Sequence, residues 1–273
     1  MANTVRNAYS MSILIALLSL AGCLGAPAET GMKSTPPAGV YSGQTISTKY
    51  NQTGVIYGTL SNQTSYGKPV VVATLAMNQN QQIMGIFSTT LSTTTDQSIS
   101  CLSAADSVSL NPTSLATISG VINFSNCQWN GSQFSASYNV YKQSTGTLLD
   151  SGTLTLALDS NCQAYSSAVT TLGNGSYSGN FQSCLAPESS TLSGVIANSS
   201  ILFNLTQESN LALLVGTAGS DYTQQLTESV TAGSYAGYIT PLYLTNLNQN
   251  DSNYSGNYVS YYDYGILNLS ESN

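Results

Sequence analysis

The stretch Phe134-Ser-Ala-Ser-Tyr-Asn-Val-Tyr141 alternates between less polar and more polar side chains. Its less polar phase contains Phe134, Ala136, Tyr138 and Val140. Successive side chains on a β-strand point to opposite faces, so a period of two indicates a strand with one buried face. This stretch therefore predicts a half-buried β-strand, and it sets the expectation for the chain around it.

The same alternation recurs elsewhere, in Thr153–Asp159 and in Ile201–Thr206. Asn130-Gly131 and Asn174-Gly175 lie between such runs, and Asn-Gly is the strongest short signal for a β-hairpin turn. No window of useful length has the 3.6-residue period of an amphipathic helix. These patterns predict an all-β, antiparallel, meandering body of about 10–12 strands, and periodicity leaves barrel and sandwich open.

Short motifs repeat along the chain, which indicates a recurring pair of strands. Gly39-Val-Tyr-Ser-Gly43 is followed by Gly175-Ser-Tyr-Ser-Gly179, Gly233-Ser-Tyr-Ala-Gly237 and Asn253-Tyr-Ser-Gly256. A second motif, Thr117-Ile-Ser-Gly-Val-Ile122, recurs as Thr191-Leu-Ser-Gly-Val-Ile196 and more weakly as Thr53-Gly-Val-Ile56. We expect an internal duplication, and the alternative is chance similarity in a chain rich in Ser, Gly and Tyr.

Composition excludes several classes of protein. The chain has 273 residues, of which 41% are hydrophobic and only 6% are charged, and it contains no His. Without His there is no Ser-His-Asp triad, no Cys-His pair and no His-ligated zinc or haem. With 5 Lys+Arg against 12 Asp+Glu, the chain cannot neutralise a run of phosphates. We therefore expect no nucleic-acid partner, and no cofactor or metal is indicated.

The N-terminus has the pattern of an export signal. Residues 1–10 carry one cation, Arg6, and the apolar run Met11–Ala21 follows. This run is shorter than the ~20 apolar residues that span a bilayer as a helix. A weakly basic start, a short apolar stretch and then small residues are typical of a secretory signal.

The signal ends in Leu20-Ala21-Gly22-Cys23, and here the chain resembles the bacterial lipoproteins with their lipobox Leu-(Ala/Ser)-(Gly/Ala)-Cys. The resemblance covers residues 1–23 only. It implies cleavage before Cys23, acyl chains such as palmitate on that cysteine, and anchoring to a membrane through lipid alone. Leu24, where Asp would favour the inner membrane, implies the outer membrane. The alternative is an ordinary signal with an incidental cysteine.

Three segments follow from this reading. Residues 1–22 are the signal peptide, residues 23–38 are the lipidated cysteine and a Pro-rich flexible tether, and residues 39–273 are the β-body. The residues of the body resemble no specific family.

Four cysteines remain after Cys23, namely Cys101, Cys127, Cys162 and Cys184. An even number in an exported chain predicts disulfides, with three connectivities to choose from. Cys162 and Cys184 lie at equal distances from Gly173, beside the Asn174-Gly175 turn signal, and the other two straddle the Asn111-Pro112 turn signal. Spacing therefore favours the pairs 101–127 and 162–184. A four-thiolate metal site would need CxxC-type spacing, which is missing.

One motif invites a catalytic interpretation. Leu148-Leu-Asp-Ser-Gly-Thr153 resembles the catalytic motif of aspartic proteases, in which two carboxylates share a proton and activate water. The chain has a single copy, so catalysis would need a homodimer that pairs two Asp150 side chains. The alternative is a polar turn at the start of a strand.

Aromatic residues gather near the C-terminus, at Tyr254, Tyr258, Tyr261, Tyr262 and Tyr264. Adjacent Tyr261 and Tyr262 point to opposite faces of a strand, so we expect at least one of them to be exposed, and an exposed Tyr offers contact area for a glycan or an envelope protein. The alternative is that they cover a half-buried sheet. Trp129, the only Trp, is either a core residue or a ligand platform.

Taken together, the sequence favours a lipid-anchored cell-envelope protein with a non-enzymatic binding or scaffolding role. Two alternatives remain. One is a carboxylate-dependent hydrolase of envelope polymers or peptides that uses Asp150. The other is a subunit of an envelope complex or surface fibre that pairs through an edge strand.

Overall fold

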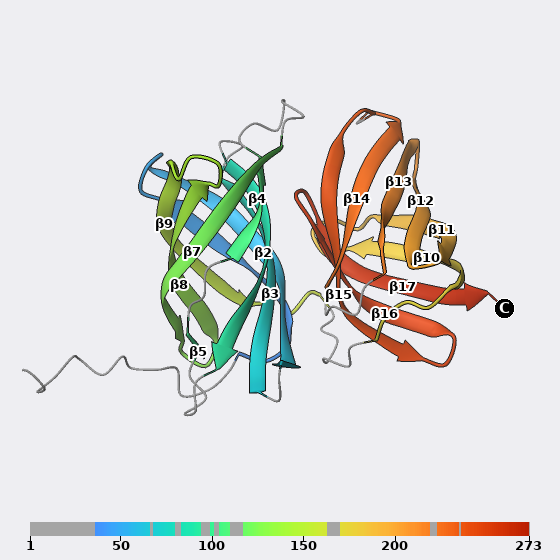
Figure 1. The fold of residues 1–273 in the computed structure, drawn as a ribbon, viewed down its shortest axis with the longest axis horizontal. Helices are drawn as coiled ribbons and strands as arrows, with labels where there is room; N and C mark the ends of the chain where they lie inside the picture. Colours follow the sequence, from blue (N-terminus) through green and yellow to red (C-terminus); the bar gives the residue numbers. More distant parts are fainter. Residues whose placement is uncertain are drawn as a thin grey trace, which may run out of the picture. The chain divides into compact units, whose positions relative to one another are not determined.

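A computed structural model of the chain describes residues 36–65, 68–79, 83–93, 99–100, 104–109, 117–162, 170–218, 223–234 and 236–272. Within these ranges every regular element is a β-strand and every pairing is antiparallel. The predicted antiparallel all-β architecture is therefore confirmed (Figure 1). The described part of the chain holds seventeen strands, more than the dozen or so expected.

Nine strands form the N-terminal sheet: β1 (Gly39–Ser47), β2 (Gln52–Ser65), β3 (Lys68–Gln79), β4 (Ile83–Thr93), β5 (Ile99–Ser100), β6 (Ala104–Ser109), β7 (Thr117–Trp129), β8 (Gln133–Lys142) and β9 (Leu148–Leu158). The short β5 pairs with β4 alone, β4 also pairs with β3 and β6, every other strand pairs with two neighbours, and β9 pairs back onto β1. The pairings thus return to their starting strand. Their weakest link is between β4 and β6, which share two residue pairs.

Eight strands form the C-terminal barrel: β10 (Gly175–Ser183), β11 (Ser189–Ala197), β12 (Ser200–Gln207), β13 (Asn210–Thr217), β14 (Thr223–Ala232), β15 (Ile239–Asn250), β16 (Asn253–Ser260) and β17 (Tyr264–Ser272). The barrel is closed by pairing of β17 with β10. The choice between barrel and sandwich is settled in favour of the barrel. Since each of its strands has two partners, the barrel has no edge strand for an added strand to pair with.

Several strands lack the alternation that sequence analysis relies on, because both of their faces are buried. On β3, consecutive residues from Val70 to Met77 are all less than 9% exposed. Strand β16 likewise has five consecutive buried residues at its end. The inward faces line the core of each sheet, and the outward faces belong to a contact between the sheet and the barrel that is described below. Such strands read as continuous apolar runs.

The two interiors are filled by apolar side chains. The core of the N-terminal sheet includes Tyr41, Phe87 and Trp129, and the core of the barrel includes Tyr177 and Phe203. The Tyr41 ring makes an edge-to-face contact with Trp129 at 6.2 Å between centroids, and Tyr177 does the same with Phe203 at 6.1 Å. Full burial of one such side chain contributes roughly 1.5–3 kcal/mol.

The first strands of the two sheets are structural equivalents. Tyr41 on β1 pairs with Gly58, and Tyr177 on β10 pairs with Gly194. Each tyrosine hydroxyl donates to the carbonyl four residues earlier, at Pro37 (2.7 Å) and at Gly173 (2.9 Å). The predicted Gly-x-Tyr-x-Gly repeat therefore marks the opening strand of each sheet.

The late strands correspond as well. The register of β7 with β8 shifts at a bulge that contains Asn126, and the register of β15 with β16 shifts at one that contains Asn246. Both asparagines have a φ of 53°, in the left-handed region that suits Asn. The sheet and the barrel thus share both their strand order and their irregularities.

Other repeat matches do not correspond. Gly233–Gly237 follows the end of β14, and Asn253–Gly256 lies on β16. The Ser-Gly-Val-Ile motif falls on β7 in the sheet and on β11 in the barrel, which occupy different places in the strand order. Its weaker match Thr53–Ile56 lies on β2, the counterpart of β11, but Gly58 and not Gly54 occupies the place of Gly194.

One of the two predicted hairpin turns is confirmed. Asn130-Gly131 joins β7 to β8, where the Asn130 side chain accepts hydrogen bonds from the amides of Ser132 and Gln133. Asn174-Gly175 instead leads into β10, which pairs with β11 and β17. The predicted hairpin there is wrong, because the alternating run before it belongs to the other sheet.

Candidate functional site

Asp150, the residue that the sequence singled out for catalysis, lies on β9 and is 0% exposed. Its Oδ1 accepts hydrogen bonds from the Ser47 hydroxyl at 2.5 Å and from the Ser151 amide at 2.8 Å. Its Oδ2 accepts one from the Tyr138 hydroxyl at 2.8 Å. Because Ser47 ends β1 and Tyr138 lies on β8, one carboxylate joins three neighbouring strands.

The barrel contains the same arrangement around Asp263, which immediately precedes β17. Its Oδ1 accepts from the Ser183 hydroxyl at 2.7 Å and from the Tyr264 amide at 2.8 Å, and its Oδ2 accepts from the Tyr258 hydroxyl at 2.5 Å. Ser183 ends the first strand and Tyr258 lies on the penultimate one. We call Ser47–Tyr138–Asp150 and Ser183–Tyr258–Asp263 the two Ser-Tyr-Asp clasps.

Each clasp also holds the turn that follows the first strand. The Ser47 hydroxyl accepts a hydrogen bond from the Tyr50 amide at 3.0 Å. The Ser183 hydroxyl accepts from the amides of Leu185 and Ala186, both at 3.1 Å. The serine oxygen thus accepts hydrogen bonds from backbone amides at the turn, while the serine hydroxyl donates a hydrogen bond to the aspartate.

A glycine two residues after each clasp aspartate lets the backbones meet. A Cβ at Gly152 would lie 2.0 Å from the Ile46 carbonyl oxygen, and one at Gly265 would lie 2.0 Å from the Gln182 carbonyl oxygen. No side chain fits at that distance. The motif Asp-x-Gly therefore belongs to the seam where the last strand meets the first.

This geometry gives Asp150 a structural role. A protease of the aspartic type needs two carboxylates that share a proton and contact water. The Asp150 side chain is fully buried and both of its oxygens accept protein donors, so a second copy cannot bring its own Asp150 into hydrogen-bonding distance. This geometry gives the homodimer interpretation no support, and a near-identical clasp in the barrel gives the same residues a structural explanation.

Burial shifts the titration of several groups at the clasps. It raises the pKa of the Tyr138 hydroxyl, and the hydrogen bond to Asp150 adds to that rise. Burial also raises the pKa of Asp263, against the opposing effect of its Tyr258 and Ser183 donors. Nearby on β14, Glu228 accepts from the Thr240 hydroxyl at 3.1 Å, and burial and the charge of Asp263 raise its pKa.

These acids do not form a metal centre. In the part of the chain that the structure describes, no three His, Cys, Asp or Glu side chains gather closely enough to hold an ion.

The aromatic candidates lie mostly inside the protein. The exposed fraction is 9% for Trp129, which is a core residue and no platform. Four of the predicted binding tyrosines are between 3% and 5% exposed: Tyr254, Tyr258, Tyr261 and Tyr264. Only Tyr262, at 49%, remains on the surface. The expectation that one of the adjacent Tyr261 and Tyr262 is exposed is confirmed, whereas the other four tyrosines are covered and form no exposed patch.

The covering surface is the N-terminal sheet. The Tyr57 ring stacks on Tyr264 at 4.7 Å between centroids, and the Tyr57 hydroxyl donates to the Tyr261 carbonyl at 2.7 Å. Further along β2, the Thr59 hydroxyl bonds to Thr245 at 3.1 Å. An apolar cluster with members from β1–β4 and from β15–β17 fills the contact. Tyr261 and Tyr264 thus join the sheet to the barrel, whereas Tyr254 and Tyr258 belong to the barrel core.

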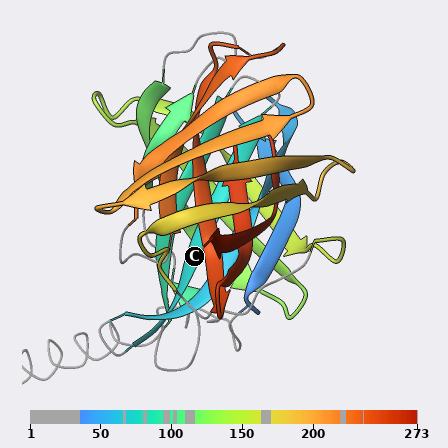
Figure 2. The ribbon, with the colours of Figure 1, turned by 90° about the vertical axis from the view of Figure 1, so that its right-hand side faces the viewer.

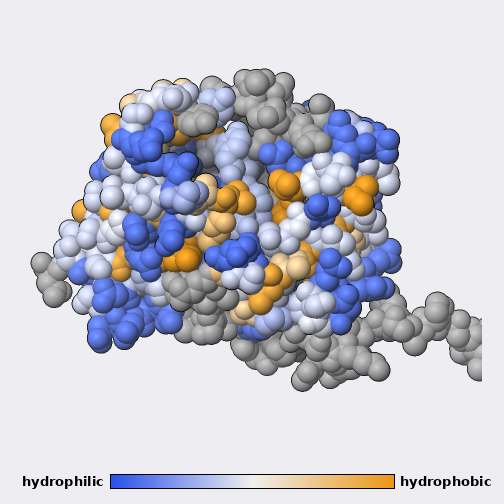
Figure 3. Space-filling model, turned by 180° about the vertical axis from the view of Figure 1, so that it is seen from behind, coloured by the Kyte–Doolittle hydropathy of each residue, from blue (hydrophilic) through white to orange (hydrophobic). Residues whose placement is uncertain are grey.

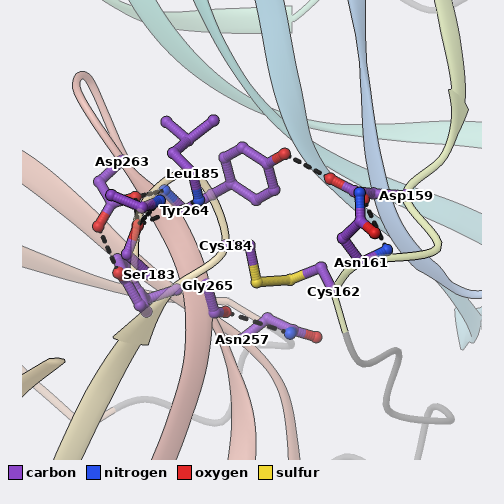
Figure 4. Close-up of a disulfide and its surroundings, with 12 residues drawn as sticks. Asp159, Asn161, Cys162, Ser183, Cys184, Leu185, Asn257, Asp263, Tyr264 and Gly265 are labelled. Atoms are coloured by element: carbon purple, nitrogen blue, oxygen red, sulfur yellow. Dashed lines mark hydrogen bonds between the residues drawn. A yellow bond between two sulfur atoms is a disulfide. The ribbon is translucent and has the colours of Figure 1, made fainter. Parts of the chain in front are cut away.

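A disulfide reinforces this contact (Figure 4). Cys162 follows β9 and Cys184 follows β10, and their sulfur atoms are bonded at 2.02 Å. The neighbouring Tyr264 hydroxyl donates to the Asp159 carboxylate, so β17 also contacts the start of the segment that links sheet and barrel. The predicted 162–184 pair is confirmed, although the two cysteines do not face each other across a hairpin.

The structure does not decide the predictions for the other cysteines. Cys127 on β7 is disulfide-bonded, but its predicted partner Cys101 lies outside the described residues. Cys23 also lies outside them. The 101–127 bridge and the lipidation site therefore stay predictions.

The sequence contained a signal for the clasps that periodicity did not reveal. The pattern Gly-x-Tyr-Ser-Gly-x-x-x-Ser occurs at 39–47 and again at 175–183. The pattern Asp-x-Gly-x-Leu-x-Leu occurs at 150–156 and again at 263–269. Read together, these two pairs mark the first and last strand of each sheet, and they would have identified Ser47, Ser183 and Asp263.

No family model, curated protein or solved structure matches the chain.

Removing a clasp carboxylate should destabilise the protein. We expect Asp150→Ala to lower the free energy of unfolding by about 2–4 kcal/mol, because the Ser47 and Tyr138 hydroxyls lose a buried acceptor. Asp263→Ala should cost a similar amount, and the exposed Glu188→Ala less than about 0.5 kcal/mol. Urea titration followed by circular dichroism measures all three. An Asp150→Ala protein as stable as Glu188→Ala would contradict the structural role.

The double variant Cys162→Ser/Cys184→Ser tests the disulfide. In the chain-entropy model, a loop closed between residues 22 apart contributes about 3 kcal/mol. We expect a loss of that order in urea titration under non-reducing conditions, together with faster proteolysis between β9 and β10. If wild type and double variant unfold at the same urea concentration, the bridge contributes nothing.

The raised carboxyl pKa values predict an unusual pH dependence. An unfolded Glu titrates near about 4.3, so above that pH the folded protein binds more protons at Glu228 and Asp263 than the unfolded chain does. Their contribution to stability is present at low pH and is lost as pH rises through the folded pKa. Glu228→Gln should therefore raise the thermal midpoint more at pH 8 than at pH 5. An equal shift at both values would refute this.

Proposed function

We propose that this protein is a lipid-anchored component of the cell envelope whose two-part β-body acts as a non-enzymatic scaffold or binding module. The anchor is Cys23, at the end of the lipobox Leu20-Ala21-Gly22-Cys23. An acylated cysteine with more than one chain gives stable membrane attachment. The disulfide between Cys162 and Cys184 fits an exported chain that folds in an oxidising compartment.

The main support for a non-enzymatic role is that Asp150 belongs to a Ser-Tyr-Asp clasp that occurs a second time in the barrel. A catalytic carboxylate has to contact its substrate, whereas the Asp150 side chain is 0% exposed and both of its oxygens accept hydrogen bonds from protein donors. Asp150 and Asp263 instead occupy equivalent places at two seams, each accepting three hydrogen bonds. Asp150, the best candidate for a hydrolase residue, thus has a structural explanation.

The form of the body supports a scaffold. Both interiors are filled with apolar side chains, and a disulfide and aromatic contacts join the sheet to the barrel. Among the described residues there is no helix that is long and apolar enough to cross a membrane. The proposed attachment is the lipid on Cys23, and Leu24 favours the outer membrane as its location. The proposed partners are the membrane and an envelope protein or glycan.

Metabolic labelling tests the anchor. Cells that express the full chain should incorporate labelled palmitate into it, and Cys23→Ala should abolish the label and move the protein out of the membrane fraction. Asp150→Asn tests the non-enzymatic role. It should restore the envelope phenotype of a deletion strain as well as wild type does, at matched protein levels. An unlabelled wild-type protein would remove the anchor, and failure of a folded Asp150→Asn protein would favour the hydrolase.

A further inference from the structure

The residues that lead into the first strand lie against the core at one end of the N-terminal sheet. Pro36, five residues before the core residue Tyr41, is buried. The Asn62 side chain on β2 donates a hydrogen bond to the Pro36 carbonyl at 3.4 Å, and the Tyr41 hydroxyl donates to the Pro37 carbonyl at 2.7 Å. We call residues 36–38 the entry segment.

The barrel is entered in the same way. Leu172, five residues before Tyr177, is 3% exposed and belongs to the barrel core. The Tyr177 hydroxyl donates to the Gly173 carbonyl, as the Tyr41 hydroxyl does to Pro37. Because this contact occurs in both halves, it belongs to the fold, and it fixes the point at which the chain enters the N-terminal sheet.

The entry segment marks one end of the sheet. Tyr41 contacts Trp129, the last residue of β7, so this end also carries the turn from β7 to β8. Strand β8 runs from this end to the opposite one, and its ten residues span about 33 Å. The turn at 143–147, which follows β8, therefore lies at the far end.

The proposed anchor and the entry segment are close in sequence. Cys23 and Pro36 are 13 residues apart, and a chain spans at most about 3.5 Å per residue. Lipid on Cys23 therefore keeps Pro36 within roughly 45 Å of the bilayer. On the face in Figure 3, apolar residues lie in small groups among hydrophilic ones, so this face offers no broad apolar surface for insertion into lipid. Attachment through the N-terminus thus favours the end with the entry segment as the nearer one.

Charge also distinguishes the two halves. Residues 24–169 contain four Lys and five acidic residues, a net charge of −1, whereas residues 170–273 contain seven acidic residues and neither Lys nor Arg, a net charge of −7. The strands of the barrel, yellow to red in Figure 2, belong to the second range. A bilayer with anionic lipid repels such a body within a Debye length of about 10 Å. Close approach to the lipid is therefore less unfavourable for the N-terminal sheet.

We propose that the end of the N-terminal sheet that holds the entry segment is the end nearest the bilayer, and that the turn at 143–147 faces away from the lipid. The inference rests on the proposed lipid anchor, and it adds which surface of the protein meets the membrane. Attachment and charge favour the same arrangement, although one concerns residues 23–38 and the other the whole chain. The far end of the sheet is then the one open to a partner in the envelope.

Energy transfer from a dye on the protein to an acceptor on lipid headgroups tests the orientation. Ser132→Cys and Thr145→Cys place the dye on exposed turns before and after β8. Protein expressed from the full chain and purified with its anchor is inserted into vesicles of equal parts phosphatidylcholine and phosphatidylglycerol. Transfer from position 132 should be at least twice as efficient as transfer from position 145. Wild type treated with the same dye gives the background, and thermal melts confirm that the variants fold.

A second preparation separates the orientation from the anchor. The chain contains no His, so a hexahistidine tag in place of residues 1–23 binds nickel-chelating lipid at that one point. Transfer should again be greater from position 132 than from position 145. Equal transfer, or greater transfer from position 145, in either preparation overturns the orientation. A full chain that carries no acyl group refutes the anchor, and the tagged protein still decides the orientation.

Discussion

The whole architecture depends on bringing the first strand of each sheet against its last. A meander of paired strands has two open edges unless its ends meet, and an open edge exposes unpaired amides and carbonyls. In both halves the seam is fixed by a carboxylate that accepts hydrogen bonds from a serine on the first strand and from a tyrosine on the penultimate strand. Glycines at 152 and 265 allow the backbones to approach. The rest of each sheet lies between these fixed ends.

Sequence periodicity predicted the architecture where only one face of a strand is buried. Phe134–Tyr141 lies within β8, whose burial alternates residue by residue, and Asn130-Gly131 is its hairpin turn. Prediction failed where a second layer covers the outer face. Strand β3 and the end of β16 are buried on both sides, so their residues do not alternate, and the strand number was set too low.

The role of Asp150 cannot be predicted from its local motif for a related reason. Asp150 resembles a catalytic aspartate in isolation, because a local motif contains no information about what accepts or donates across the sheet. Its partner Ser47 is 103 residues away and reaches it through the pairing of β1 with β9, while Tyr138 reaches it through the pairing of β8 with β9. The sequence around Tyr264 likewise could not show that this residue is covered, because the ring that stacks on it comes from Tyr57, far away along the chain. Cysteine spacing, in contrast, predicted the Cys162–Cys184 pair correctly, although the hairpin on which that prediction rested does not form.

Seams that join first and last strands impose an order of events on a chain made from its N-terminus. Gly43 pairs with Leu156, so the N-terminal sheet can complete its ring without any residue of the barrel. Gly179 pairs with Leu269, so the barrel stays open until β17 is available. Cys184 becomes available long before that and can bond to Cys162 first. A prematurely terminated chain would therefore keep an intact first half, already crosslinked to a row of unclosed strands.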